Sequence, residues 1–504
     1  FCAVDGVKGG KVRGVSLGNW LVIEGWMKPS LFKDIPNADM LDGAEVRFRS
    51  LSLNKYVSAK NGGGSGVLID QAIGDKWETF RLWRLSEWNY QIRTQNGEFL
   101  SCTGQGASVT TTSKSPSLPE TFTIDRSSYD RVRIKHSSGT YLQASSGKEL
   151  KANYVGTPNF DDAKAAIFNM TVVGNKHGEY QLSNGYGPEK AKKVLTEHRN
   201  NYITREDFRY LSKHGINTVR IPVGWWIAKD PNPPAPYVGG SLAALDNAFK
   251  WAKEFGIKCI INLHAAPGSQ NGEEHSSSRD GSIDWPKPEN LQQTLDVISF
   301  LATKYGSDPA LLGIDLLNNP KVPFHTLKKY YKDGYDIVRN HSSTAYVIMC
   351  QLMGNDSINP APADLYNANI GKSKVVLDLH YYNVHNSIFE NMSAEQNVNY
   401  LYNIRKTEMN SLNAVDGPLI FIGEWVNDFG KGEHSQMEYQ NFGRAQLKVY
   451  GSASFGWAYW TLKNENNHWS FEWNIDNNYL QLGTYLGPAP APAPTAAGND
   501  YFGH

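Results

Sequence analysis

The stretch from residue 217 to residue 264 reads NTVRIPV (217–223), then SLAALDNAFKWAKEFG (241–256), then KCIINLH (258–264). The outer two segments are nearly continuous apolar runs of strand length, and the middle one repeats apolar residues at helical spacing. A strand, a helix and a second strand in this order predict a parallel βαβ unit whose strands are buried on both faces.

Strands of the same kind recur along the chain, with helical patterns such as NLQQTLDVISFLATKYG (290–306) between most of them. The other six strand candidates are VRGVSLG (12–18), LLGIDLL (311–317), YVIMCQ (346–351), VVLDLHYY (375–382), LIFIGEW (419–425) and SFGWAYWT (454–461). Eight such strands predict an α/β fold that closes as a (β/α)₈ TIM barrel. A doubly wound sheet is the alternative, but no G-x-G-x-x-G motif opens any strand–helix unit.

Charge and hydropathy exclude several classes of function. The 504 residues carry 50 Lys and Arg against 50 Asp and Glu, so the net charge is zero and no basic stripe indicates a nucleic-acid partner. No run approaches the roughly 20 apolar residues that a membrane span needs. Cys259 and Cys350 lie in apolar runs and are expected in the core. Whether Cys2 and Cys102 form a disulfide is left open. The four cysteines do not have the spacing of a metal site.

Residues 43–175 have a different sequence pattern, with short runs in which apolar and polar residues alternate and with many turn residues. The pairs Tyr56-Val57, Phe99-Leu100 and Tyr141-Leu142 recur at spacings of 43 and 42 residues. Three units of about 40 residues are typical of a three-fold all-β fold, and the segment resembles the fascin-like β-trefoil. A β-sandwich with coincidental spacing is the alternative. The barrel would then comprise residues 1–42 and 176–486, and the β domain would be inserted after the first barrel strand.

Other features favour a secreted protein, extracellular, in the cell wall or vacuolar. N-x-S/T sequons that could carry glycans occur at Asn169, Asn340, Asn355 and Asn391. The chain begins at Phe1 rather than Met, so we expect that an N-terminal segment has been removed or is not included in the sequence. Residues 487–504 begin with GPAPAPAPT and are predicted to be a Pro/Ala-rich tail without chemistry. The oligomeric state cannot be inferred from the sequence.

Seven of the eight predicted strands carry unusual polar residues at or just after the end where barrel enzymes hold their active sites. They are Glu24, Arg220, His264, Asn318 with Asn319, His380 with Tyr382, Glu424 and Trp460. A purely structural barrel does not need this set, which therefore predicts a functional site. Tryptophans are also expected around the entrance: Trp225, Trp226, Trp425, Trp457, Trp469 and Trp473.

Several of these stretches resemble motifs of glycoside hydrolase family 5, in its exo-β-1,3-glucanase and β-glucosidase branch. They are RGVSLGNWLVIEGWMKPSLF, VRIPVGWW, LHAAPGSQNG, LDLHYY, IGEW and GWAYWTLKNEN. Plant members of the family are similar in carrying a fascin-like insertion at the same place. The resemblance implies that Glu424 is the catalytic nucleophile and Glu24 a ligand of sugar hydroxyls. It also implies an aromatic floor at Trp460 and residues around the nucleophile at Arg220, His264, Asn318, His380 and Tyr382.

One position departs from the family pattern. The family's fourth strand ends in Asn-Glu-Pro, in which the Glu is the general acid/base, whereas this chain has Asn318-Asn319-Pro320. An amide cannot donate a proton to a departing sugar oxygen, and general acid–base catalysis contributes about 10²- to 10⁴-fold. We therefore expect weak hydrolysis of ordinary β-glucosides and β-glucans. Transglycosylation from activated donors, such as glucose esters or aryl glucosides, should be favoured.

Three explanations of Asn319 remain open: an engineered acid/base mutant of a normal hydrolase, a native transglycosidase, or a catalytically silent carbohydrate-binding protein. A further alternative moves the acid to Glu273, Glu274 or His275, on the loop after the third strand. Expected partners are β-glucosides, glucose esters or β-glucan oligosaccharides, without nucleic acid or membrane. Other motif matches fail: Gly14-Val-Ser-Leu-Gly18 lies inside a strand with no helix immediately after it. No metal or organic cofactor is implied.

Overall fold

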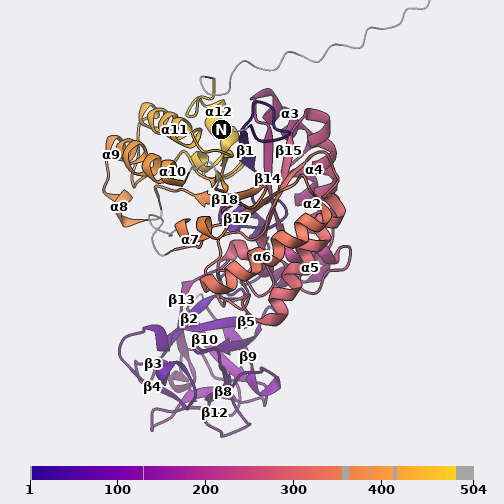
Figure 1. Cartoon of the computed structure of the whole chain (residues 1–504). Helices are drawn as coiled ribbons and strands as arrows, with labels where there is room; N and C mark the ends of the chain where they lie inside the picture. Colours follow the sequence, from indigo (N-terminus) through magenta and orange to yellow (C-terminus); the bar gives the residue numbers. More distant parts are fainter. Residues whose placement is uncertain (1–2, 129, 355–361, 385, 413–416, 484–504) are drawn as a thin grey trace, which may run out of the picture.

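The computed structural model describes residues 3–128, 130–354, 362–384, 386–412 and 417–483. They form an α/β barrel and a separate β domain, which lie one above the other in Figure 1. The predicted tail 487–504, Asn355 and Cys2 lie outside the described residues.

The barrel is closed by parallel strands that pair in chain order around the ring. They are β1 (Val12–Ser16), β14 (Thr218–Gly224), β15 (Lys258–Ala265), β16 (Leu311–Asp315), β17 (Tyr346–Cys350), β18 (Val375–His380), β19 (Leu419–Glu424) and β20 (Gly456–Tyr459). Each overlaps one of the eight predicted strands, so the (β/α)₈ prediction is confirmed. The strands are almost entirely buried, as the apolar runs require.

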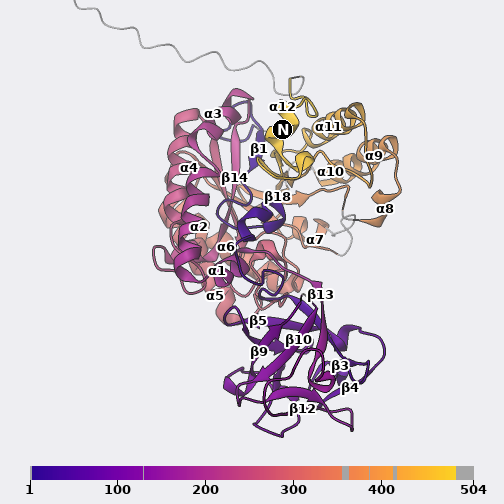
Figure 2. The same ribbon diagram turned by 180° about the vertical axis from the view of Figure 1, so that it is seen from behind.

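Helices surround the strands in Figures 1 and 2 and shield their outer face. They are α1 (Glu179–Tyr186), α2 (Pro188–Asn201), α3 (Arg205–Lys213), α4 (Ser241–Phe255), α5 (Pro288–Tyr305), α6 (Phe324–His341), α7 (Pro362–Asn367), α8 (Ser387–Glu390), α9 (Ala394–Tyr400), α10 (Lys406–Leu412), α11 (Gln436–Tyr450) and α12 (Phe471–Asp476). The predicted helices 241–256 and 290–306 correspond to α4 and α5. None of the helices in the described part of the chain combines the length and apolar character needed to cross a bilayer.

The β domain follows β1 in the chain and has a core of its own. Its strands are β2 (Glu45–Ser50), β3 (Tyr56–Ala59), β4 (Val67–Gln71), β5 (Phe80–Arg84), β6 (Asn89–Arg93), β7 (Phe99–Ser101), β8 (Thr110–Ser113), β9 (Thr121–Arg126), β10 (Arg131–His136), β11 (Tyr141–Ala144), β12 (Leu150–Tyr154) and β13 (Phe168–Gly174). They pair antiparallel in one connected sheet. Phe48, Phe80, Phe122 and Phe168 are buried together in its core.

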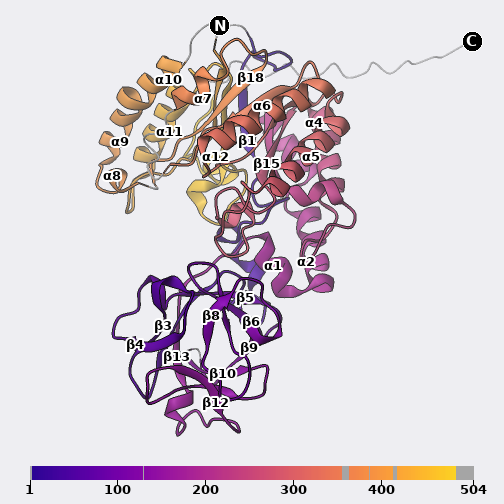
Figure 3. The same cartoon turned by 60° about the horizontal axis from the view of Figure 1, so that its bottom comes forward.

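The β domain contacts the barrel at the loop between β15 and α5. In Figure 3 the β domain lies below the barrel. Asp280 of this loop accepts hydrogen bonds from Trp83 Nε1 at 2.7 Å and Arg93 Nη1 at 2.6 Å. Arg279 stacks over the Trp83 ring, with its guanidinium carbon 3.8 Å from the ring centroid. Trp83 and Arg93 lie on strands of the β domain. The inserted domain therefore holds the loop that follows the carboxyl end of β15.

The remaining sequons lie in different settings. Asn169 is half-buried in β13, where its backbone pairs with two neighbouring strands. Asn340 near the end of α6 and Asn391 after α8 are exposed. Exposure makes Asn340 and Asn391 the more accessible acceptors for a glycan.

Candidate active site

A cavity of about 760 Å³ opens at the carboxyl ends of the barrel strands. Of the predicted site residues, Arg220 lies beneath it, and the others line it: Glu24, His264, Asn318, Asn319, His380, Tyr382, Glu424 and Trp460. Residues from the loop after β15 and from the segment after β13 also contribute to the wall: Glu273, Glu274, His275, Asn175 and Lys176. The structure therefore brings the predicted set together at one site.

Arg220 and Glu424 form the centre of the site. Arg220 projects from β14, and Glu424 is the last residue of β19. Arg220 Nη1 donates a 2.9 Å hydrogen bond to Glu424 Oε1, and Tyr382 donates a 2.6 Å bond to Oε2. Glu424 is only 3% exposed, and a buried carboxylate requires partners of this kind. The contacts fix the direction of the carboxylate and stabilise its charge.

Arg220 also contacts residues on two other strands. Its Nη2 donates to Asn318 Oδ1 at 2.7 Å and to Asp315 Oδ2 at 3.1 Å, and Asp378 Oδ2 lies 3.5 Å away. Burial acts to lower the pKa of Arg220, but the surrounding carboxylates outweigh it and raise the pKa. A single guanidinium thus organises three buried acids and an amide.

Asp315 and Asp378 form a buried pair with perturbed protonation. Burial raises the pKa of Asp315 to about 7 and that of Asp378 to about 6, against the favourable charge of Arg220. Asp378 Oδ1 also accepts a 2.9 Å hydrogen bond from the backbone of Gly423, where a Cβ would lie 2.1 Å from this oxygen. Glycine therefore allows β19 to approach Asp378 closely, and near neutral pH the pair retains part of its protons.

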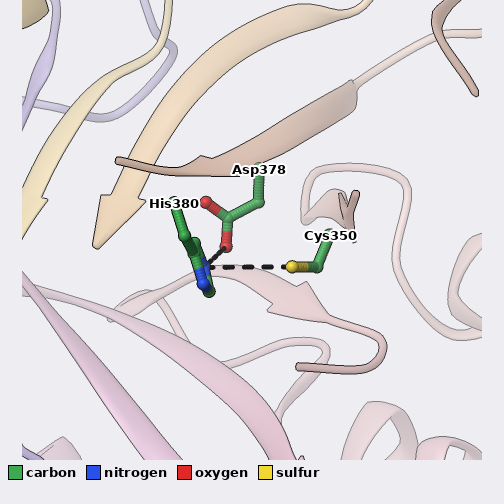
Figure 4. Close-up of side chains that lie close together, drawn as sticks. All are labelled: Cys350, Asp378 and His380. Atoms are coloured by element: carbon green, nitrogen blue, oxygen red, sulfur yellow. Dashed lines mark hydrogen bonds and ion pairs between the residues drawn. The ribbon is translucent and has the colours of Figure 1, made fainter. Parts of the chain in front are cut away.

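Figure 4 shows Asp378 with His380 and Cys350, whose potential ligand atoms lie within 4.8 Å of one another. His380 Nε2 is 3.1 Å from Asp378 Oδ2 and 3.9 Å from Cys350 Sγ. Burial raises the pKa of the Cys350 thiol well above its ordinary value, and the neighbouring Arg220 already carries positive charge beside Asp378. A neutral thiol and an adjacent guanidinium fit a hydrogen-bond network better than a cation site.

Burial also lowers the pKa of His380 to about 4, so this imidazole is neutral near neutral pH. Its Nδ1 lies 3.3 Å from Glu424 Oε2. His380 therefore borders the carboxylate without adding a second positive charge to that of Arg220.

The opposite side of the cavity is formed by Glu24, His264 and Trp460. His264 Nε2 lies 3.2 Å from Glu24 Oε1, and its Nδ1 lies 2.7 Å from Asn262 Oδ1. The His264 ring stacks on Trp460 with an interplanar angle of 7°. Burial raises the pKa of Glu24, while the nearby His275 opposes this change. A flat indole beside acceptor oxygens can hold a sugar ring by stacking and by hydrogen bonds to its hydroxyl groups.

Asn319 lies at the wall of the cavity with its backbone in the left-handed region, at φ 44°. Asparagine adopts this conformation more readily than most residues. Its Oδ1 lies 3.9 Å from Cys350 Sγ, and its backbone carbonyl accepts a 3.0 Å hydrogen bond from Asn271 Nδ2. The residue is thus fixed at the cavity wall with an amide and no carboxyl group.

Asp315 and Asp378 belong to the site but are absent from the residues predicted from the sequence, and three of the tryptophans expected at the entrance lie elsewhere. Asp315 and Asp378 could have been found as charged residues inside the apolar runs GIDLL and VVLDLH. Of the tryptophans expected at the entrance, Trp469 lines the cavity, whereas Trp226, Trp425 and Trp457 are buried in the core. Trp26, which is not among the predicted residues, also lines the cavity. Its ring packs edge-on against Trp469, with the ring centroids 5.0 Å apart.

Comparison with known families agrees with this site. Residues 183–466, more than half of the chain, match the family described as cellulase (glycosyl hydrolase family 5). The chain belongs to glycosyl hydrolase family 5. This membership makes the protein a glycoside hydrolase and accounts for the polar residues gathered at the carboxyl ends of the barrel strands.

Curated relatives match more than half of the chain. A glucan 1,3-beta-glucosidase of Yarrowia lipolytica is 31% identical over a 339-residue alignment, which covers 59% of this chain and 79% of that protein. A glucan 1,3-beta-glucosidase of Blumeria graminis is 32% identical over a 344-residue alignment, which covers 60% of this chain and 78% of that protein. These relatives place the chain in the exo-β-glucosidase-like branch of the family.

Solved structures share the barrel fold. The rutinosidase from Aspergillus niger superposes with a TM-score of 0.53 at 20% identity, covering 60% of this chain and 89% of that one. Residues 37–173 match a separate family, a domain of unknown function (DUF7910). The β domain is thus recognised as a unit of its own, distinct from the family 5 barrel.

Proposed function

We propose that the protein is a retaining β-glucoside-active enzyme in which Glu424 is the nucleophile. The observation that carries this proposal is the Glu424 carboxylate, held by Arg220 and Tyr382 at the cavity formed by the strand ends. A retaining glycosidase forms a covalent bond between such a carboxylate and the anomeric carbon. Glu24, His264, Asn318, His380 and Trp460 would bind the glucosyl unit in the same cavity.

The position of the general acid/base is assigned to Asn319. Because its amide cannot protonate a leaving oxygen, the first step requires a leaving group that departs as a stable anion, such as a carboxylate or a phenolate. Without a base to activate water, the glucosyl intermediate persists long enough for other acceptors to compete. The proposal is therefore transglycosylation from glucose esters or aryl glucosides with weak hydrolysis, whether Asn319 is native or engineered.

The glucan 1,3-beta-glucosidases among the relatives support a β-linked glucosyl donor, including β-glucan oligosaccharides. The N-x-S/T sequons support a secreted glycoprotein. We assign the barrel to residues 1–42 and 176–486, and the tail to residues 487–504.

We assign residues 43–175 to a fascin-like β-trefoil. The three repeated pairs begin equivalent strands: β3 starts at Tyr56, β7 at Phe99 and β11 at Tyr141. Each of these strands then pairs antiparallel with the next one, β4, β8 or β12. This three-fold repetition of a hairpin supports a trefoil over a β-sandwich.

The proposed nucleophile can be tested with 2,4-dinitrophenyl β-glucoside, whose phenolate leaves without protonation. We expect release of dinitrophenolate that azide accelerates, with β-glucosyl azide as the product, because azide attacks the intermediate without a base. Glu424→Gln should abolish this release. Glu254→Gln, at an exposed position on α4, is the matched control and should retain it.

The result separates the enzyme from a sugar-binding protein. No release of dinitrophenolate by the unaltered protein would contradict the proposed activity and favour a catalytically silent carbohydrate-binding protein. Release that persists undiminished in Glu424→Gln would contradict the assignment of the nucleophile.

A further inference from the structure

The loop between β15 and α5 places His275 in the cavity beside Asn319, and the proposed reaction gives this residue no role. Asn271 of the same loop connects the two residues. Its Nδ2 donates to the carbonyl oxygen of Asn319 at 3.0 Å and lies 2.8 Å from His275 Nε2. His275 is therefore held at a fixed place next to the position assigned to the missing acid/base.

The direction of the Asn271 amide determines which imidazole nitrogen carries the proton. Asn271 Oδ1 accepts a 2.9 Å hydrogen bond from the backbone nitrogen of Glu273, so Nδ2 must be the atom that faces His275. An amide nitrogen only donates, and Nε2 of His275 must therefore accept. The proton of the neutral imidazole then lies on Nδ1. Among the described residues, no protein group forms a hydrogen bond with this Nδ1.

The surroundings of His275 keep the ring neutral. Burial lowers its pKa to about 4, while the negative charge of Glu24 opposes this change. At pH 5 to 7 His275 consequently has one N–H to donate in a hydrogen bond but no readily available proton to transfer. The neighbouring Asn319 has the same character, since its Oδ1 faces Cys350 and its Nδ2 can only donate.

We propose that His275 Nδ1 and Asn319 Nδ2 form a pair of neutral hydrogen-bond donors that stabilise a departing carboxylate without protonating it. The substrate class that suits this pair is the β-glucosyl ester of a carboxylic acid, and the inference rests on the proposed function of Glu424. Lys321, which follows Pro320 and lines the same cavity, adds positive charge near the leaving group. Glu273 on the same wall has the opposite charge, and its Oε2 lies 3.9 Å from Lys176 Nζ.

The chemistry balances without a general acid. Glu424 forms a bond to the anomeric carbon, and the bond to the ester oxygen breaks with its electron pair passing to the leaving carboxylate. In the second step a different carboxylate attacks the anomeric carbon, and the electron pair of the broken bond returns to Glu424. The net reaction exchanges one carboxylate for another on glucose and moves no proton. Preorganised donors are well suited to stabilise the charge that develops in both steps.

Two donor substrates with different leaving groups test the proposal. β-Glucosyl benzoate releases an anionic oxygen, whereas N-(β-glucosyl)pyridinium releases neutral pyridine, which develops no negative charge. His275→Phe should lower the ratio of kcat/KM for the benzoate over the pyridinium substrate by roughly 10- to 100-fold, as expected for the loss of a hydrogen bond to a charged group. His275→Asn keeps an N–H near the position of Nδ1 and should retain most of the ratio.

His325→Phe, at an exposed position on α6, is the matched control and should leave the ratio unchanged. The thermal melting temperature of each variant shows whether it is folded. An unchanged ratio in folded His275→Phe, with azide-accelerated release of dinitrophenolate intact, would overturn the role of His275 and leave the proposed function standing. Equal losses in His275→Phe and His275→Asn would also overturn it. If the unaltered protein releases no dinitrophenolate, both proposals fail.

Discussion

Arg220 donates a 2.9 Å hydrogen bond to Glu424, and both side chains are buried beside two further carboxyl groups, Asp315 and Asp378. Removing one partner of a buried ion pair leaves the other uncompensated. Arg220→Met should therefore lower the free energy of unfolding by about 3 to 5 kcal/mol in urea denaturation. Arg209→Met, at an exposed ion pair on α3, is the control and should change it by less than about 1 kcal/mol. A similar effect of the two substitutions would show that Arg220 does not organise the acids.

The Asp315–Asp378 pair predicts a dependence of stability on pH. Both pKa values are raised in the folded protein, to about 7 and about 6 from an ordinary value of 3.8. Between pH 4 and 7 the folded state therefore holds protons that the unfolded state has released. The stabilisation is complete below about pH 4 and is lost as the pH rises through 6 and 7.

Asp315→Asn removes one titrating group. As the pH rises from 5 to 8, the free energy of unfolding of this variant should therefore fall less steeply than that of the unaltered protein. Urea denaturation at several pH values measures both slopes. Asp336→Asn, on the exposed face of α6, should keep the original slope. A slope in Asp315→Asn as steep as the original would mean that the pair is ionised in the folded state.

The barrel could be predicted because parallel strands buried on both faces require continuous apolar runs. Its polar residues could be predicted because they lie at or just after the same end of those runs. The entrance tryptophans were harder to place, as Glu424 and Trp425 illustrate. Successive residues of an extended chain point to opposite faces. Glu424 at the end of β19 faces the cavity, and Trp425 directly after it packs among Tyr450, Trp457 and Tyr459 instead.

Contacts between distant segments carry no local signal in the sequence. Asp280 and Trp83 are 197 residues apart, and neither apolar periodicity nor a motif predicts that they meet. The orientation of the Asn271 amide is of the same kind, because it depends on a backbone nitrogen and a carbonyl oxygen placed by tertiary structure. Resemblance to a family located the site, but its hydrogen-bond directions require coordinates.

Restoring a carboxyl group at position 319 tests the role assigned to this residue. Asn319→Glu should raise kcat/KM for a β-1,3-linked glucose disaccharide by about 10²- to 10⁴-fold, because a general acid can then protonate the leaving sugar. Asn319→Gln has the same side-chain length without the acid and is the matched control. Glucose release measures the gain. An equal gain in both variants would show that size, rather than proton transfer, limits the reaction at this position.

The contact between the β domain and the barrel should support both stability and binding. Asp280 is buried and accepts hydrogen bonds from Trp83 and Arg93, and the same loop carries His275 into the cavity. Asp280→Ala leaves Arg93 and the Trp83 N–H without this acceptor, and should lower the free energy of unfolding by about 2 to 3 kcal/mol. It should also raise KM for 2,4-dinitrophenyl β-glucoside, because the loop is no longer held by the β domain.

The pH dependence of this contact distinguishes it from a simple packing effect. Burial acts to raise the pKa of Asp280, but Arg93, Ser282 and Trp83 outweigh it and lower the pKa to about 2. For a carboxyl group with a lowered pKa, the stabilisation is present above about pH 4 and is lost as the pH falls toward 2. The loss of unfolding free energy caused by Asp280→Ala should therefore be larger at pH 6 than at pH 3. Asp284→Ala, in the same loop at a more exposed ion pair, should have a small effect at both pH values. Equal destabilisation by Asp280→Ala at pH 6 and pH 3 would show that the carboxylate charge does not hold the β domain to the loop.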